Sequence, residues 1–191
     1  MSADPVLHLL AGPNGAGKST FYARVLAPVT HLPFVNADEI AHARWPGAES
    51  DHAYDASRAA ADQRAAYLAS GESFVTETVF SHESKVRLVE SATAANYLVT
   101  LHIVAMPVDL AVARVSNRVE LGGHSVPEAK VRERYDRLWP LVRSAIEIVD
   151  HAVLYDNSSA RTPFRTVARF DRGQLVGHAT WPAWIPAAFT A

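Results

Sequence analysis

The sequence predicts an α/β fold, in which a parallel five-stranded β-sheet is flanked by helices and followed by a C-terminal β-hairpin. Short apolar runs alternate with longer segments of helical periodicity, which is the pattern of consecutive βαβ units. A glycine-rich segment at residues 12–19 separates the first apolar run from the first helix. Near the C-terminus, Asp171-Arg172-Gly173 separates two extended segments, as the turn of a hairpin does.

The expected strands are short, because each apolar run ends at turn-forming residues. We expect strands at residues 6–10, 33–36, 73–76, 97–105 and 153–155. Helices are expected at residues 18–25, 50–70, 81–95 and 109–121, with a long one ending near 149. Asp109 is expected to cap the fourth of these helices and Gly71 to close the second. We expect residues 1–191 to form a single domain, with a lid at about 119–134 and a hairpin and Trp-rich tail at about 164–191.

Composition excludes several classes of protein. With 191 residues, 49% of them apolar and 20% charged, the chain resembles an ordinary soluble domain. A formal net charge of −2 gives no field that would attract nucleic acid or an anionic membrane, so we expect neither as a partner. The absence of cysteine excludes disulfides and thiolate nucleophiles. The first residues do not resemble a signal peptide, and we expect a cytoplasmic protein.

One motif predicts nucleotide binding. Residues 12–19 fit the pattern G-x-x-x-x-G-K-[ST] and lie between an expected strand and an expected helix. In such a loop, glycines let backbone N–H groups surround a phosphate, the lysine contacts the β- and γ-phosphates, and the hydroxyl ligates Mg²⁺. The alternative is a glycine-rich turn that binds nothing. The predicted ATP-binding residues are Gly12, Pro13, Asn14, Gly15, Ala16, Gly17, Lys18, Ser19 and Thr20, with Ser19 as the Mg²⁺ ligand.

Missing motifs favour a kinase among the proteins that use such a loop. The chain has no N-K-x-D motif for reading guanine and no Leu-Ser-Gly-Gly-Gln run of a transporter ATPase. No strand ends in the Asp-Glu pair of those machines, because Ala37-Asp38-Glu39 comes too early, after the second expected strand.

Three arginines are expected to serve a lid. Arg114 and Arg118 lie four residues apart on one helix face, with no acidic residue at helical spacing. Arg134 lies at the edge of the apolar stripe of the next helix and also has no acidic residue three or four positions away. Residues 121–124 form a hinge between the two helices, and residues 125–128 read as a capping box. Such a lid would close cations over a transferred phosphoryl group. The alternative is that these arginines form ion pairs elsewhere in the fold.

Two acids follow expected strands, at the edge of a parallel sheet where ligands bind. Asp38 follows the second strand and is a candidate general base for a substrate hydroxyl. Glu77 follows the third strand and is a candidate to hold a Mg²⁺-bound water or a substrate hydroxyl. The alternatives are a helix N-cap for Asp38 and a solvated strand end for Glu77.

In their order and spacing, these segments together resemble the zeta-toxin family of P-loop kinases. The resemblance extends over about residues 6–160, and the spelling at residues 36–39 is that of a compact branch of the family. The segments that carry it are residues 11–20, 35–40, 73–78, 114–119, 122–127, 134–135 and 156–158.

The resemblance implies a phosphotransferase that uses ATP and Mg²⁺. The best-known members phosphorylate UDP-N-acetylglucosamine at a sugar hydroxyl and are held inactive by a small helical antitoxin. By this similarity, Asp38 is the general base and Arg118 and Arg134 are lid arginines. The resemblance also assigns Lys18 to the phosphates, and Glu77 and Thr78 to the substrate site. It assigns Asn157 to the adenine site, and we count Arg114 with it among the ATP-binding residues. Residues 42–54 are expected to line the substrate pocket.

The predicted function is therefore an ATP-dependent small-molecule kinase. It would transfer the γ-phosphoryl group to a hydroxyl of a nucleotide sugar like UDP-N-acetylglucosamine, or of a related metabolite, and one form of this is the toxin of a toxin–antitoxin pair. The alternative is an ATP-dependent conformational switch or binding protein with little acceptor chemistry. A polynucleotide kinase is disfavoured, because the chain has no basic stripe to follow a phosphate backbone.

Overall fold

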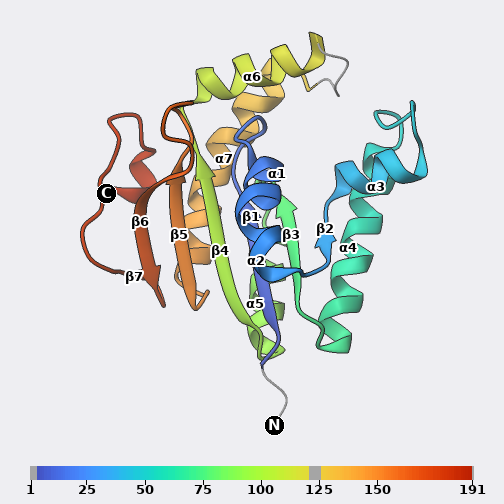
Figure 1. Ribbon diagram of the computed structural model, residues 1–191, viewed down its shortest axis with the longest axis horizontal. Helices are drawn as coiled ribbons and strands as arrows, with labels where there is room; N and C mark the ends of the chain where they lie inside the picture. The colour runs from blue at the N-terminus through green and yellow to red at the C-terminus, as the bar shows by residue number, and fades with distance from the viewer. Residues whose placement is uncertain (1–3, 121–125, 191) are drawn as a thin grey trace.

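The protein is built around one seven-stranded sheet, seen in a computed structural model that describes residues 4–120 and 126–190 (Figure 1). The strand order is β2-β3-β1-β4-β5-β6-β7. The five parallel strands are β1 (Val6–Ala11), β2 (Phe34–Val35), β3 (Phe74–Thr78), β4 (Leu98–Ala105) and β5 (His151–Asp156). The two antiparallel strands are β6 (Arg165–Asp171) and β7 (Gln174–Leu175).

The predicted fold class is confirmed, and the predicted hairpin proves to be part of the main sheet. β6 pairs with β5 from His151↔Asp171 to Asp156↔Arg165, so the sheet continues from five strands to seven. An uncovered β5 would leave a row of backbone N–H and C=O groups without partners, which explains why the chain adds strands at this edge. The second strand of the hairpin is much shorter than expected, because β7 has only two residues.

Helices fill the connections between the parallel strands. They are α1 (Lys18–Phe21), α2 (Ala27–Thr30), α3 (Ala37–Arg44), α4 (Ala53–Ser70), α5 (Ser84–Ala94), α6 (Val108–Glu120) and α7 (Glu128–Ile146). A π-helical turn, Tyr22–Leu26, joins α1 to α2, so the first helical segment continues to Thr30 instead of ending near residue 25. From the sequence, a helix at the position of α3 enters only through the alternative that Asp38 is an N-cap.

Helix ends agree with the sequence in some places and differ in others. Gly71 closes α4 in the left-handed conformation, with φ of 68°, as expected for a C-terminal glycine. Asp109 does not cap α6 and lies within its first turn. The predicted capping box is also wrong, because α7 has Pro127 as its N-cap, with no side-chain hydrogen bond. Ser125 and the predicted hinge at residues 121–124 lie outside the described residues.

Successive side chains of the parallel strands point to opposite faces of the sheet, and each face has its own hydrophobic core. Leu9 and Leu101 face a core completed by α4, α5 and α7. Leu10 and Val104 face the other core, which Phe21 completes from α1. In Figure 1 the carboxyl ends of the parallel strands point to one edge, where α6 crosses on one side and α3 and α4 stand on the other. The functional residues are therefore expected at that edge.

The C-terminal tail packs onto the fold through aromatic rings. Phe189 lies 5.8 Å from the ring of Trp139 on α7 and 6.2 Å from that of Trp181, measured between centroids. The N–H of Thr180 donates to the carbonyl of Val167 on β6 at 2.9 Å. Among the described residues, no helix is both long and apolar enough to cross a bilayer.

Two histidines form an unusual polar contact beneath the first helix. His8 Nδ1 lies 3.1 Å from His102 Nε2, and the ring of Phe21 lies 5.5 Å from that of His102. Burial, and then the charge of His8, lowers the pKa of His102 to about 3, and burial also lowers the pKa of His8. Both imidazoles are consequently neutral in the folded protein at pH 7.

This contact predicts a loss of stability in mild acid. The folded pKa of His102 lies below its unfolded value of about 6.5. Below that pH the unfolded chain binds more protons, so the free energy of unfolding falls as the pH decreases and is unaffected above it. Because of His102, we expect the free energy of unfolding to fall by up to about 1.4 kcal/mol per pH unit below about pH 6. Urea unfolding at pH 7.5 and at pH 5.5 measures this change in the free energy of unfolding.

The matched variants for this measurement are His102→Gln and His178→Gln. His178 is exposed, so its replacement should leave the pH dependence of the wild-type protein unchanged. Replacement of His102 should make the unfolding free energy less sensitive to pH. An identical pH dependence in both variants would contradict the explanation.

Candidate active site

The loop at residues 12–17 has a conformation that only glycine permits at two points. Gly12 has φ of 151°, and a Cβ there would lie 2.2 Å from the carbonyl oxygen of Val104 on β4. Gly15 has φ of 77°, and a Cβ there would lie 2.8 Å from the carbonyl oxygen of Ala111 on α6. These close approaches let the loop turn between β4 and α6, with α1 starting directly after Gly17. The result is a backbone cradle at a helix N-terminus, which suits a phosphate.

Asn157, just after β5, supports this loop from behind. Its side-chain Nδ2 donates to the carbonyl of Ala16 at 2.8 Å, and its backbone N–H donates to the carbonyl of Ala105 on β4 at 2.9 Å. Arg114 Nη2 in turn donates to the Asn157 carbonyl at 3.1 Å. Asn157 is buried. Its contacts therefore fix the position of the loop, and the place at the adenine site that the family resemblance implies for it stays a prediction.

The neighbouring Asp156 anchors the turn that carries Asn157. Asp156 Oδ1 accepts the N–H of Ser158 at 2.8 Å, and Oδ2 accepts from Arg165 at 3.0 Å. Burial opposes ionisation of this carboxyl, but the hydrogen bonds from Ser158 and Arg165 outweigh it and lower its pKa. The Asp156 carboxyl is therefore ionised at neutral pH and keeps its hydrogen bonds to Ser158 and Arg165.

Glu77, at the end of β3, joins three elements around the loop. Its Oε2 accepts from Ser19 Oγ at 2.8 Å and from Asn36 Nδ2 at 3.1 Å. Its Oε1 lies 3.6 Å from Lys18 Nζ, and that ammonium group also donates to the carbonyl of Pro13 at 3.1 Å. The alternative of a solvated strand end is wrong for Glu77, because the carboxylate is mostly buried against these partners.

Asp38 keeps its carboxylate available because a neighbour caps the helix. Asn36 is the N-cap of α3, and its Oδ1 accepts the N–H of Asp38 at 2.8 Å. The alternative that Asp38 is the N-cap is therefore wrong. Within residues 4–120 and 126–190, no side chain forms a hydrogen bond or ion pair with the Asp38 carboxylate, which is exposed in the first turn of α3. Next to it, burial and the charge of Glu77 raise the pKa of Glu39.

A large cleft, here called the main cleft, brings the predicted groups together. Its volume is about 1080 Å³. The predicted site residues that line it are Asn14, Gly15, Gly17, Lys18, Ser19, Thr20, Asp38, Glu77, Thr78, Arg114, Arg118 and Arg134. Gly12, Pro13 and Ala16 are buried beneath it as the foundation of the loop. The predicted residues other than Asn157 thus lie along or beneath one continuous cleft.

The three arginines reach the main cleft from α6 and α7. Arg114 and Arg118 come from α6, and Arg134 comes from α7. Arg132 holds the two helices together, because it contacts Asp109 on α6 at 2.8 Å and Glu128 at 2.9 Å. In the described part of the chain, no carboxylate forms an ion pair with Arg114 or Arg134. The alternative of structural ion pairs therefore does not apply to these two residues.

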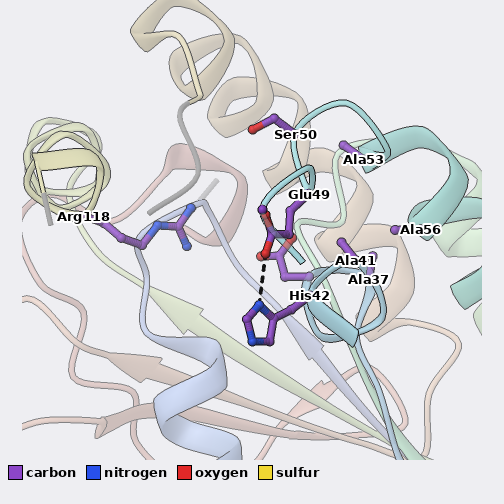
Figure 2. Close-up of a pocket in the computed structure, with 10 residues that line it drawn as sticks. Ala37, Ala41, His42, Glu49, Ser50, Ala53, Ala56 and Arg118 are labelled. Carbon is purple, nitrogen blue, oxygen red and sulfur yellow. Dashed lines mark hydrogen bonds and ion pairs between the residues drawn. The ribbon is translucent and has the colours of Figure 1, made fainter. Parts of the chain in front are cut away.

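A second cavity of about 570 Å³ adjoins the main cleft at Asp38 (Figure 2). We call it the alanine cavity, because Ala37, Ala41, Ala53 and Ala56 line it. Figure 2 shows Arg118 pointing toward this cavity from α6, across from the segment that joins α3 to α4. His42 and Glu49 form its rim, with His42 Nδ1 3.0 Å from Glu49 Oε1. Hydrogen bonds from the nearby backbone, and then the contact with His42, lower the pKa of Glu49.

The donor atoms beside the loop fit Mg²⁺. The hydroxyl of Ser19 and the carboxylate of Glu77 are hard oxygen ligands 2.8 Å apart, and Mg²⁺ takes one or two such ligands together with water and phosphate oxygens. Among the described residues, no group of three or more His, Asp or Glu side chains could hold a metal unaided.

Sequence reasoning missed several residues of the site. Asn36 could have been found as an N-cap, since Asn before Ala37-Asp38-Glu39 is a common helix start. Arg64 and Lys85 line the main cleft from the interior of α4 and the start of α5. No local pattern distinguishes these two cations from surface residues of the same helices.

Fold and site together define a P-loop protein with a kinase-like fold. A phosphate-binding loop, strand-end acids and arginines from two neighbouring helices converge on one cleft of a parallel sheet. The sequence profile of the AAA domain family matches residues 7–141, and the chain belongs to that family. A comparison with curated proteins gave no match.

Solved structures with the same fold include a two-protein complex and a toxin–antitoxin system. The AvrRxo1-ORF1:AvrRxo1-ORF2 complex with sulphate ions matches with a TM-score of 0.70 and 16% identity, covering 92% of this chain and 61% of that one. The same complex with ATP matches equally well. The PezAT chromosomal toxin–antitoxin system of Streptococcus pneumoniae matches with a TM-score of 0.64 and 14% identity, covering 86% of this chain and 72% of that one. The predicted resemblance to zeta-toxin-like P-loop kinases is confirmed at the level of fold.

The contacts of Asn157 predict a measurable cost of removing its side chain. Asn157→Ala leaves the buried carbonyl of Ala16 without its hydrogen bond, so we expect the free energy of unfolding to fall by about 1–3 kcal/mol. Asn117→Ala, at an exposed position on α6, is the control and should change it by less than about 0.5 kcal/mol. Urea unfolding measures both, and equal losses would contradict this role of Asn157.

Proposed function

We propose that the protein is an ATP-dependent kinase that phosphorylates a hydroxyl group of a small molecule. The observation that carries this proposal is the position of Asp38. Its exposed carboxylate lies on the main cleft, which is also lined by the loop lysine and the cations of α6 and α7. A carboxylate without a partner in such a cleft suits a base that must accept a proton from a substrate.

The loop is proposed to bind the triphosphate of ATP. Its backbone N–H groups and the N-terminus of α1 would face the phosphates, and Lys18 would move from Pro13 and Glu77 onto them. When bound beside Ser19, Mg²⁺ would neutralise charge on the β- and γ-phosphates. Release of Lys18 from Glu77 would leave that carboxylate bound to Ser19 and Asn36.

Transfer is proposed to proceed in line between the acceptor and ATP. The acceptor oxygen forms a bond to the γ-phosphorus, the bond to the β–γ bridging oxygen breaks, and ADP leaves. The proton of the hydroxyl passes to the Asp38 carboxylate. Arg118 and Arg134 would stabilise the negative charge on the transferred group, as cations do in other phosphoryl transfers.

The acceptor is proposed to be a nucleotide sugar such as UDP-N-acetylglucosamine, or a related metabolite. The volume of the main cleft and the adjoining alanine cavity leave room for an acceptor of that size beside ATP. The competing proposal is a nucleotide-dependent switch with little acceptor chemistry. Slow ATP hydrolysis that no acceptor accelerates would favour the switch.

Replacement of the proposed base should abolish transfer without preventing folding. For Asp38→Asn we expect kcat to fall by about 10²–10⁴-fold. Asp55→Asn, at an exposed position on α4, is the control and should retain wild-type activity. Labelled ATP with Mg²⁺, tested with UDP-N-acetylglucosamine and with a metabolite extract, gives the rate. Undiminished labelling by Asp38→Asn would exclude this base.

A second candidate function is that of a toxin controlled by a protein partner. It is supported by the fold neighbours, which come from a two-protein complex and from a toxin–antitoxin system. The chain spans 61% of the length of the AvrRxo1-ORF1:AvrRxo1-ORF2 chain that it matches, so a partner of this chain remains a proposal.

Expression in a bacterial host tests this second candidate. We expect the wild-type protein to slow growth at least about tenfold more than Lys18→Ala, because the lysine is needed to bind phosphates. Colony counts after induction, at equal protein levels, measure the effect. If active wild-type protein is harmless, the toxin proposal fails and the kinase proposal does not.

A further inference from the structure

Two cations, the buried Arg64 and the half-buried Lys85, line the main cleft on elements that have no part in the proposed transfer. Arg64 lies on α4, and Lys85 lies in the first turn of α5. Both side chains contribute to the wall of the cleft, and neither belongs to the phosphate-binding loop or to the helices α6 and α7.

Arg64 is almost completely buried and has very little to compensate its charge. Its exposed fraction is 6%. Among the described residues, its one hydrogen bond is from Nη1 to Thr76 Oγ1 at 3.5 Å, the upper limit for such a bond, and it forms no ion pair. The Thr76 hydroxyl already donates to the carbonyl of Val35 at 2.9 Å. A guanidinium group has five N–H donors, so most of them lack an acceptor from the described chain.

Lys85 is also in an unfavourable position for a cation. It is the second residue of α5, where the positive end of the helix dipole repels an ammonium group. Burial, and then the charge of Arg64, lowers the pKa of Lys85. In the described residues no carboxylate forms an ion pair with it. An oxyanion between the two side chains and the N-terminus of α5 would compensate the charges of Arg64 and Lys85, and it would also interact favourably with the helix dipole.

We propose that Arg64 and Lys85 form an anion subsite for the phosphoryl acceptor, which is consequently an alcohol that carries a phosphate or carboxylate group. Identification of the bound molecule as the acceptor rests on the proposed function. The planar fork of Arg64 suits two parallel hydrogen bonds to an oxyanion, and Lys85 supplies a point charge. The subsite would hold the acceptor by its anionic group while Asp38 faces its hydroxyl.

Binding to the full-length protein tests the subsite without any turnover. The loop is first saturated with ADP and Mg²⁺, and calorimetric titrations then use four probes. Inorganic phosphate and UDP-N-acetylglucosamine carry phosphate, gluconate carries a carboxylate, and N-acetylglucosamine is neutral. We expect at least one anionic probe to bind at least about tenfold more tightly than the neutral one, and the preferred probe identifies the anion. If no anionic probe binds more tightly than N-acetylglucosamine, the proposal is overturned.

Variants assign that binding to the two cations. Arg64→Met and Lys85→Met should each weaken the preferred probe at least about tenfold. Arg87→Met is the matched control on α5, because Arg87 is exposed and lies 3.8 Å from Glu83, and it should bind like the wild type. Arg64→Met should also raise the melting temperature, since it removes an uncompensated buried charge. A lower melting temperature with unchanged affinity would show that Arg64 is structural and would overturn the subsite.

The outcome for the subsite can be separated from the outcome for the kinase. If no phosphoryl transfer is found, binding that depends on Arg64 and Lys85 still establishes an anion site. If Arg64→Met phosphorylates its acceptor at the wild-type rate and KM, the kinase proposal stands and the subsite is overturned.

Discussion

The position of the phosphate-binding loop depends on Asn157. This one residue bonds to the loop through its side chain, to β4 through its N–H and to Arg114 on α6 through its carbonyl. The loop itself has no apolar side chain large enough to hold it in place, and its glycines give it more freedom than other residues would. Hydrogen bonds from a buried amide after β5 therefore supply the rigidity that a cradle of backbone N–H groups needs.

Charges in the main cleft are arranged in two groups. Near the loop, Glu77 compensates Lys18 and orders Ser19 and Asn36, so the cation is balanced by the protein itself. On α4 and α5, Arg64 and Lys85 are balanced by nothing in the described chain. Asp38 lies on the same cleft with a free carboxylate because Asn36 performs the capping role. This asymmetry indicates that the cleft receives negative charge from its ligands.

The sequence predicts those features that depend on local patterns. The loop motif, the five parallel strands and the closing Gly71 each follow from neighbouring residues, and Asp38, Glu77 and Arg134 follow from their positions relative to expected elements. The features it missed depend on tertiary contacts. Whether Arg64 faces solvent or a cleft is decided by what packs on α4, and the attachment of the hairpin to β5 is decided by strand pairing far apart in the chain. The structural role of Asn157 in holding the loop was missed for the same reason.

The sheet ends in very short strands on both sides. β2 and β7 have two residues each, and beyond β7 the N–H groups of Val176 and Thr180 bond to carbonyls of β6 at 2.8 and 2.9 Å. A long, flat outer strand would offer a template on which another chain could pair and start aggregation. Here little unpaired backbone remains along β6, so the tail after β7 protects this flank of the sheet from unwanted intermolecular strand addition.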